Sequence, residues 1–238
     1  MSSGAALPLS DGDIYERMVS AILDHRLPPG TKLVEDKLAG AFGVSRTRIR
    51  PVLVRLASEQ VVTLTPHRGA TITQPTEQEA REVFEARRLI EPTLVALFIT
   101  HASEADMARL KACIDEEESA RLAGDVRRAI RLSGDFHLHI AERAGHRTLG
   151  RILRELVSRT SLILMRYSAP QERLGDEKAT AACGCREHRA LLDAVGLRDA
   201  PEAGRRMRGH LSRLESQLRF TAAADEAPDL CALFAMPA

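Results

Sequence analysis

Aromatic side chains are scarce in this 238-residue sequence: tryptophan is absent, and aromatic residues make up 3% of the chain. Surfaces that stack the bases of single-stranded nucleic acid, and aromatic sugar sites, depend on such side chains, so the composition disfavours both. Cysteines are also few, and they are irregularly spaced: Cys113, Cys183, Cys185 and Cys231. They do not form a disulfide framework, which favours a reducing cytoplasm.

Long apolar runs are missing as well. No stretch of 18 or more apolar residues occurs, so the sequence predicts no membrane-spanning helix and no membrane partner. The first ten residues lack the basic and apolar parts of a signal peptide. Nor is there an excess of charge, because 34 Lys and Arg offset 33 Asp and Glu. A nucleic-acid partner would therefore have to be bound through a local cluster of positive charge.

One such cluster lies in the stretch G-V-S-R-T-R-I-R-P-V-L-V-R-L, residues 43–56. Four apolar residues there have the i, i+3, i+4, i+7 spacing of an amphipathic helix: Ile49, Val52, Leu53 and Leu56. Arg46 and Arg50 flank one side of this stripe, Arg48 and Arg55 flank the other, and the stretch has no acidic residue. Surface helices usually mix their charges. The pattern therefore favours a DNA-recognition helix over an ordinary solvated face.

The segments around this helix complete a small domain over residues 10–74. Ser10-x-x-Asp13 can cap a first helix, which the sequence P-P-G ends. A short second helix leads through a G-V turn to Ser45, a good N-cap for the cationic helix. Beyond it, V-V-T-L-T and A-T-I-T alternate around the turn P-H-R-G, which predicts a two-stranded hairpin. Three helices followed by a β-wing predict a winged helix-turn-helix, whose second and third helices form the DNA-binding pair.

The motifs of this domain resemble the DNA-binding domain of the GntR family of bacterial transcription regulators. P-P-G-T-K-L, L-A-x-x-F-G-V-S-R-T-R-I-R, L-x-R-L-A and H-R-G-A follow one another in order over residues 12–73. The resemblance implies that Arg46 and Arg50 touch double-stranded operator DNA and that Thr47 and Arg48 occupy neighbouring contact positions.

The same resemblance implies that the wing tip, Arg68 and Gly69, enters the minor groove. Arginine forks can read guanine in the major groove and so specify sequence. The hydroxyls of Ser45 and Thr47, together with His67, are expected to contact phosphate, which orients the protein without specifying sequence.

Two positions depart from the family pattern. Asp36 follows Glu35 where the family usually has Arg, so a DNA contact is expected to be missing there, and a carboxylate would repel phosphate. Pro51 stands where the family more often has Glu. Because Pro51 has no N–H for the carbonyl of Thr47, it predicts a local kink or a widened turn after Thr47.

Beyond a linker at residues 75–78 the pattern becomes wholly helical, which predicts an all-α bundle over 79–222 and a tail over 223–238. The expected helices span 76–102, 103–123, 125–144, 148–167, 187–197 and 201–219. Pro92 is expected to kink or split the first of them, and residues 169–186 are expected to form a looser segment. The predicted fold class is therefore mostly α: a winged helix-turn-helix followed by an all-α bundle.

This bundle resembles the FadR-type (FCD) effector domain of one GntR subgroup. The resemblance is carried by E-A-R-R-L-I-E-P, D-F-H-L-H-I-A-E-R-A-G, E-H-R-A-L-L-D-A and M-R-G-H-L, within residues 79–220. It implies a ligand-responsive transcription regulator, most often a repressor, that acts at the nucleoid in the bacterial cytoplasm. Such a protein binds operator DNA as a homodimer and responds to a small carboxylate effector.

Three of the eight histidines share a helix face with apolar residues: His137, His188 and His210. A single histidine of this kind is more often a packed core or surface residue than a ligand. Three that point inward from separate helices can form a metal site, because neutral imidazole is a preferred ligand of zinc and similar ions. Helix-bundle cores are where such sites are built.

The resemblance assigns the same three histidines to the metal site of the FCD domain. The family's fourth ligand is an Asp one turn before His137, where this sequence has Ser133, and Asp135 points to nearly the opposite side of the helix. His137, His188 and His210 could still hold zinc or nickel, with water or effector oxygens completing the shell beside Ser133. Such a site lacks one negative charge and is expected to bind metal more weakly and anions more readily.

Two further residue groups have open interpretations. Arg87 matches a family position near the effector cavity and could grip a carboxylate. Equally, it could be an exposed helix arginine paired with Glu91. Cys183-x-Cys185-x-x-His188 could form a metal or redox cluster, although its spacing favours ordinary loop cysteines.

Two rival functions also remain. A three-histidine metal centre with an open position is typical of hydrolytic zinc enzymes. Against an enzyme, no general-base carboxylate stands at a recognisable spacing, and the winged helix would have no role. An architectural DNA-binding protein with an inactive effector domain is the third alternative, because Ser133 replaces a ligand. The sequence favours the regulator, and no enzymatic activity is expected.

Overall fold

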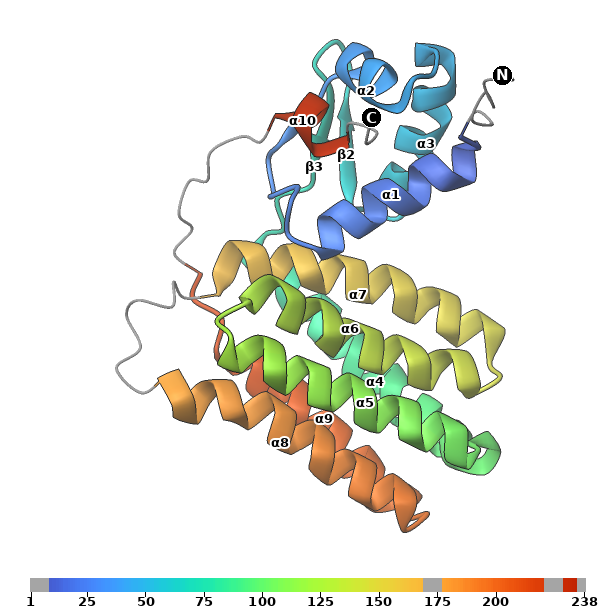
Figure 1. Ribbon diagram of the computed structural model, residues 1–238, viewed down its shortest axis with the longest axis vertical. Helices are drawn as coiled ribbons and strands as arrows, with labels where there is room; N and C mark the ends of the chain where they lie inside the picture. The colour runs from blue at the N-terminus through green and yellow to red at the C-terminus, as the bar shows by residue number, and fades with distance from the viewer. Residues whose placement is uncertain (1–8, 169–176, 221–228, 235–238) are drawn as a thin grey trace, which may run out of the picture. The chain divides into compact units, whose positions relative to one another are not determined.

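The computed structural model describes residues 9–168, 177–220 and 229–234. The chain divides into two compact units: residues 1–74 with 223–238, and residues 75–222 (Figure 1). Each unit has its own apolar core, as a chain of this length allows. Within the described part of the chain, no helix is both long enough and apolar enough to cross a membrane.

The first unit contains the three helices that the sequence predicts: α1 (Asp11–Leu23), α2 (Glu35–Phe42) and α3 (Arg46–Ser58). Helix α1 begins at the expected capping box, in which Ser10 and Asp13 each accept a hydrogen bond from the other's backbone N–H. Helix α3 buries the predicted apolar stripe. Between α2 and α3, Gly43 has a φ of 64°. Glycine adopts this left-handed conformation without a steric penalty, so the tight turn can form.

The predicted hairpin is confirmed as β2 (Val62–Thr65) and β3 (Gly69–Ile72), which pair antiparallel. A third strand, β1 (Lys32–Leu33), pairs with the other side of β3, with Leu33 opposite Ala70, so the strand order is β1-β3-β2. Two residues are too few to show alternation, so the sequence does not predict β1.

Neither internal proline ends its helix. Helix α4 (Glu77–His101) runs through Pro92, so of the two expected outcomes the split into two helices is wrong, while a kink at Pro92 stays a prediction. This helix packs against α9, α7 and α6. Helix α3 likewise continues through Pro51, and the local bend expected after Thr47 stays a prediction.

The second unit is a helical bundle formed by α4 with α5 (Glu104–Leu122), α6 (Val126–Arg143), α7 (Arg147–Tyr167), α8 (Glu177–Gly196) and α9 (Ala200–Ser216). Helix α4 packs against α9, α7 and α6, while α5 packs against α6 and α8, and α8 against α9. Figure 1 shows these helices side by side. The arrangement brings α6, α8 and α9 together around one interior.

Two expectations for this part of the chain were wrong. Helix α8 begins at Glu177, so residues 177–186 are helical rather than a looser segment, while 169–176 lie outside the described residues. Part of the predicted tail, 223–238, also forms a helix: α10 (Leu230–Phe234) packs on α2 within the first unit. There the ring centroids of Phe234 and Phe42 lie 4.7 Å apart.

Candidate functional site

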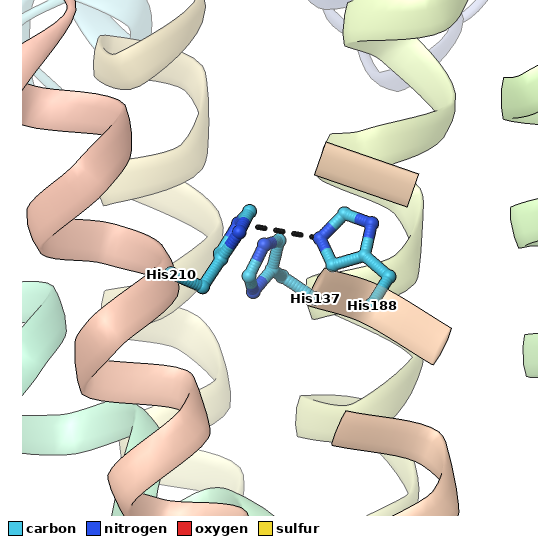
Figure 2. Close-up of side chains that lie close together, drawn as sticks. All are labelled: His137, His188 and His210. Atoms are coloured by element: carbon cyan, nitrogen blue, oxygen red, sulfur yellow. Dashed lines mark hydrogen bonds between the residues drawn. The ribbon is translucent and has the colours of Figure 1, made fainter. Parts of the chain in front are cut away.

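Three buried histidines meet in the interior of the second unit. His137 comes from α6, His188 from α8 and His210 from α9. One ring nitrogen of each lies within 4.8 Å of the others, a spacing that could hold a metal ion. Figure 2 shows the three rings turned toward one another from their separate helices. The structure thus brings together the residues that the sequence analysis selected as metal ligands.

Glutamates orient all three rings. Each Nδ1 atom lies against a glutamate Oε2 atom: His137 on Glu91 at 2.6 Å, His188 on Glu117 at 2.9 Å and His210 on Glu187 at 2.9 Å. An ionised carboxylate only accepts hydrogen bonds, so each Nδ1–H is the donor, and Nε2 is left with its lone pair. This carboxylate–histidine arrangement fixes the imidazole tautomer and direction in protein metal sites.

Arginines in turn neutralise the three glutamates. Arg87 Nε lies 2.5 Å from Glu91, Arg121 Nη2 lies 2.6 Å from Glu117, and Arg213 Nε pairs with Glu187. Each histidine therefore ends an Arg–Glu–His chain. The sequence alone did not predict that these glutamates orient the histidines. A partial signal was present, because Arg87–Glu91 and Glu117–Arg121 are i, i+4 pairs.

The ionisation states suit a metal site. Burial raises the pKa of Glu91, but Arg87 and His137 outweigh it and hold this pKa at about 2. Burial lowers the pKa of His137 to about 3 although Glu91 opposes the shift. Burial also lowers the pKa of His210, and the neighbouring His188 lowers it further. His137 and His210 are therefore neutral near pH 7, the form of imidazole that binds metal.

The geometry of two histidines supplies a direct test of fit. The Nε2 atoms of His188 and His210 lie 3.2 Å apart. When both Nδ1 atoms donate to glutamates, these two Nε2 lone pairs face each other and repel unless a cation lies at their meeting point. The donor set of three imidazoles matches zinc, nickel and related ions, so the site fits a divalent metal.

A cavity of about 160 Å³ adjoins the histidine cluster at His210. Its polar lining includes Ser133, Arg121, Glu187, His210 and Arg213. Ser133 lies one turn before His137 on α6, at the position predicted to face an effector. Val126, Ile130, Leu164 and Leu214 supply the apolar part of the lining.

Arg87 matches one of the two interpretations left open by the sequence only in part. It does pair with Glu91, but it is buried, with 2% of its surface exposed, rather than exposed as that alternative assumed. Its Nη1 atom also donates to the Thr160 hydroxyl at 3.2 Å. Its Nη2 atom is buried and has no hydrogen-bond partner within the described residues. Contact between Arg87 and an effector stays a prediction.

The cysteine cluster finds no support as a metal site. Cys185 is buried and does not belong to the histidine group in the described part of the chain. Burial raises the pKa of its thiol to about 11, so it is not a thiolate near pH 7. The side chain of Cys183 falls outside the described residues.

Three arginines of the cationic helix α3 pair with acidic residues of α1 and α2. Arg46 lies 3.1 Å from Asp36 and Arg50 lies 3.3 Å from Glu35, both on α2, and these arginine side chains are 66% and 74% exposed. Arg48 instead lies 2.8 Å from Asp11. It thus faces the start of α1.

Residues predicted to contact phosphate lie at two turns. Ser45 is at the N-cap position of α3, as predicted, but its side chain caps no helix N–H. Its hydroxyl instead pairs with that of Thr47 at 2.7 Å. His67, Arg68 and Gly69 are exposed at the β2–β3 turn, where His67 and Gly69 have φ values of 61° and 86°. They form the tip of the wing.

A winged helix-turn-helix followed by a helical bundle with a buried histidine cluster defines a class of two-domain transcription regulators. Residues 11–72 match the model of the bacterial regulatory proteins of the gntR family, and residues 82–213 match the FCD domain. The chain belongs to the GntR family and carries an FCD domain.

Similar proteins agree with this assignment. The chain is 26% identical to the regulator YdhC of Bacillus subtilis over 83% of this chain and 86% of that protein. It is 27% identical to the transcriptional repressor GlaR of Escherichia coli, over 84% and 91% of the two chains. The solved structure of E. coli McbR/YncC has the same fold, with a TM-score of 0.74 at 21% identity over 87% and 93% of the two chains. The family consists of transcription regulators rather than enzymes, so the hydrolase alternative has no support.

Proposed function

We propose that this GntR-family regulator is a repressor that binds operator DNA as a homodimer and is controlled by a small carboxylate bound at a metal centre. The observation that carries the proposal is the convergence of His137, His188 and His210, each oriented by its own glutamate. Such an arrangement is typical of a metal site and has no evident use as a packing device, because burying three imidazoles and three carboxylates is costly.

At the DNA-binding end, Arg46 and Arg50 are the proposed base readers. Both are exposed and lie on the same side of α3. Their present partners, Asp36 and Glu35, are exposed to a similar or smaller degree and form surface pairs, which are weak. DNA can therefore displace them. The wing tip at Arg68 and Gly69 is the proposed second contact, in the minor groove.

At the other end, His137, His188 and His210 would hold the metal through their Nε2 atoms. A bound divalent ion would supply positive charge for carboxylate oxygens. Ser133 would leave room beside the metal ion and offer its hydroxyl to the effector. The effector would occupy the cavity between α6, α8 and α9. The effector can change DNA binding only if it binds two domain arrangements with different affinity.

Two further parts of the proposal rest on the family. The relative GlaR is named a repressor, which supports repression as the mode of action. A homodimer places one recognition helix on each half of a pseudo-palindromic operator. Light scattering of the protein alone and on a half-site duplex would test this assembly.

The decisive experiment joins metal analysis to DNA binding. Protein purified without a histidine tag is analysed for metals, and its binding to its own upstream region is measured with and without a chelator and a panel of small carboxylates. We expect about one divalent ion per chain and a carboxylate-dependent change in affinity that the chelator abolishes. If the protein is folded without metal and no carboxylate changes its DNA affinity, the proposal is wrong. The protein would then be an effector-independent DNA-binding protein.

A further inference from the structure

The side of helix α3 that lies opposite its buried stripe carries apolar residues. At 3.6 residues per turn, Thr47, Pro51 and Val54 fall on this outward side. All three are exposed, and Val54 is 53% exposed. Arg46 and Arg50 lie to one side of them. An amphipathic surface helix normally carries polar residues opposite its buried stripe, so Pro51 and Val54 do not suit a face that meets only water.

Neither side chain contributes much to the core of the protein. Pro51 and Val54 are both exposed. A proline inside a helix also removes a backbone hydrogen bond, and its ring crowds the carbonyl four residues earlier. A single exposed apolar residue is common on protein surfaces, but here two lie three positions apart and therefore on one face. This arrangement favours a contact surface over an ordinary solvated face.

Charge identifies double-stranded DNA as the partner of this surface. The side chains of Arg46 and Arg50 are 66% and 74% exposed beside the apolar pair, and α3 contains no acidic residue. The helix is the second of the helix-turn-helix, the one that enters the major groove. A cationic face with a narrow apolar strip is complementary to that groove, which has phosphates along its edges and methyl groups among its bases.

We propose that Pro51 and Val54 recognise thymine in the operator through its C5 methyl group. The inference rests on the proposed function and deepens it, because it adds a sequence preference to the DNA contacts of α3. Pro51 has no side-chain donor and no backbone N–H, and the Val54 side chain has no polar atom. Neither side chain can hydrogen-bond to a base or a phosphate. The thymine methyl is the one methyl group that the four bases present in the major groove.

The arginines and the apolar pair would then read different bases. Arg50 directly precedes Pro51, and an arginine fork reads guanine through O6 and N7. Pro51 and Val54 are about 4.5 Å apart along the helix axis, which is close to the spacing of about 3.4 Å between successive base pairs. The pair can therefore contact one thymine or two neighbouring ones. We expect this thymine within about two base pairs of the guanine read by Arg50, because one helical turn advances only about 5.4 Å.

The test removes the thymine methyl groups one at a time. Operator duplexes are selected from a randomised DNA pool with the full-length protein, with and without zinc. Each thymine of the selected site is then replaced by deoxyuridine, which pairs with adenine in the same way but lacks the methyl group. Burial of one methyl group changes affinity about four-fold. We therefore expect at least one uracil position in each half-site to weaken binding by about this factor, measured by fluorescence anisotropy.

Variants assign the methyl contact to particular side chains. In the double variant Pro51→Ser, Val54→Ser, thymine and uracil should bind equally. Serine is a better helix former than proline, so α3 is retained, and circular dichroism confirms this. Arg50→Ala should keep the difference between thymine and uracil. Leu197→Ser removes an 82% exposed leucine next to the end of α8 and should match the parent.

A second base analogue separates the two kinds of contact. Replacement of guanine by 7-deazaguanine removes the N7 acceptor that an arginine fork uses. This replacement should weaken binding by the double variant as much as binding by the parent. In Arg50→Ala it should have no effect at one guanine of each half-site.

The outcomes distinguish this inference from the function beneath it. If uracil has no effect at any position in the parent, no methyl group is read. If the effect of uracil persists in the double variant, another residue reads it. Either result would overturn the role of Pro51 and Val54 and leave operator binding by the arginines intact. A protein that selects no sequence from the pool would overturn both the proposed operator binding and this inference.

Discussion

His188 and His210 present their Nε2 atoms to each other at 3.2 Å while each turns its Nδ1 atom to a different glutamate. When both Nδ1 atoms donate to glutamates, this contact brings two lone pairs together, a repulsion that the proposed metal ion would remove. The folded state should therefore bind metal far better than the unfolded chain does.

The first prediction concerns metal removal. Chelation should lower the melting temperature, and added zinc should restore it, because a ligand at 100 times its Kd stabilises the folded state by about 2.7 kcal/mol. Differential scanning calorimetry on untagged protein measures the shift. His188→Ala should melt at one temperature with or without zinc. A zinc-dependent shift that persists in this variant would place the metal elsewhere.

The glutamates should control metal affinity without touching the metal. Glu117→Gln keeps the size of the side chain but weakens the hydrogen bond that orients His188. Loss of such a partner typically costs 10–100-fold in metal affinity. Chelator competition measures this, and Glu118→Gln, one residue along α5 and paired with Arg189 on the surface, serves as the control. Equal affinities of the two variants would contradict a role for Glu117.

The arginines of α3 should contribute unequally to the affinity for operator DNA. Arg50→Ala should reduce specific operator binding by about 1–3 kcal/mol, the value of one good base contact, while changing binding to random DNA much less. Arg48→Ala should have a smaller effect on specificity, since Arg48 is held by Asp11 at the start of α1. Fluorescence anisotropy on operator and scrambled duplexes measures both. Equal losses on the two duplexes would mean that Arg50 contacts only the backbone.

Acid stability should depend on the cap of α5. Hydrogen bonds from Ser103, helped by Arg143, lower the pKa of Asp106 from 3.8 to about 2 despite opposition from burial. A lowered folded-state pKa stabilises the protein above the unfolded value, and this contribution is lost as the pH falls from about 4 to 2. Asp106→Asn should therefore show a smaller loss of unfolding free energy than the parent over this range. Urea titrations at pH 5, 4 and 3 measure how steeply the unfolding free energy of each protein falls with pH. Equal slopes for the parent and the variant would mean that the Asp106 carboxylate stays protonated in the folded protein.

Sequence periodicity located the three clustered histidines but could not locate their glutamate partners. A stripe of apolar residues shows which face of a helix is buried, and His137, His188 and His210 stood on such faces. Glu91 and Glu117 look in the sequence like ordinary members of surface i, i+4 pairs, which are common and weak. Their burial follows from the packing of α4 and α5 against other helices, which only the folded structure shows.

The elements that the sequence missed are short or lie in polar segments. Strand β1 has two residues, and its pairing with β3 is a long-range contact that local alternation cannot report. The first residues of α8 lack an apolar stripe, so the helix seemed to begin ten residues later than Glu177. The family resemblance placed Arg48 beside the DNA contacts; the structure adds its pair with Asp11, which periodicity could not indicate, and its contact with DNA stays a prediction.

Both ends of the described chain lie on the DNA-binding unit. The Leu9 carbonyl accepts a hydrogen bond from Arg48 of α3, and Phe234 of α10 packs on Phe42 of α2. A tag attached next to Leu9 or Phe234 would therefore lie beside the helix-turn-helix, and a polyhistidine tag would also compete for zinc. Purification should use a cleavable, metal-free tag, removed before any DNA or metal measurement.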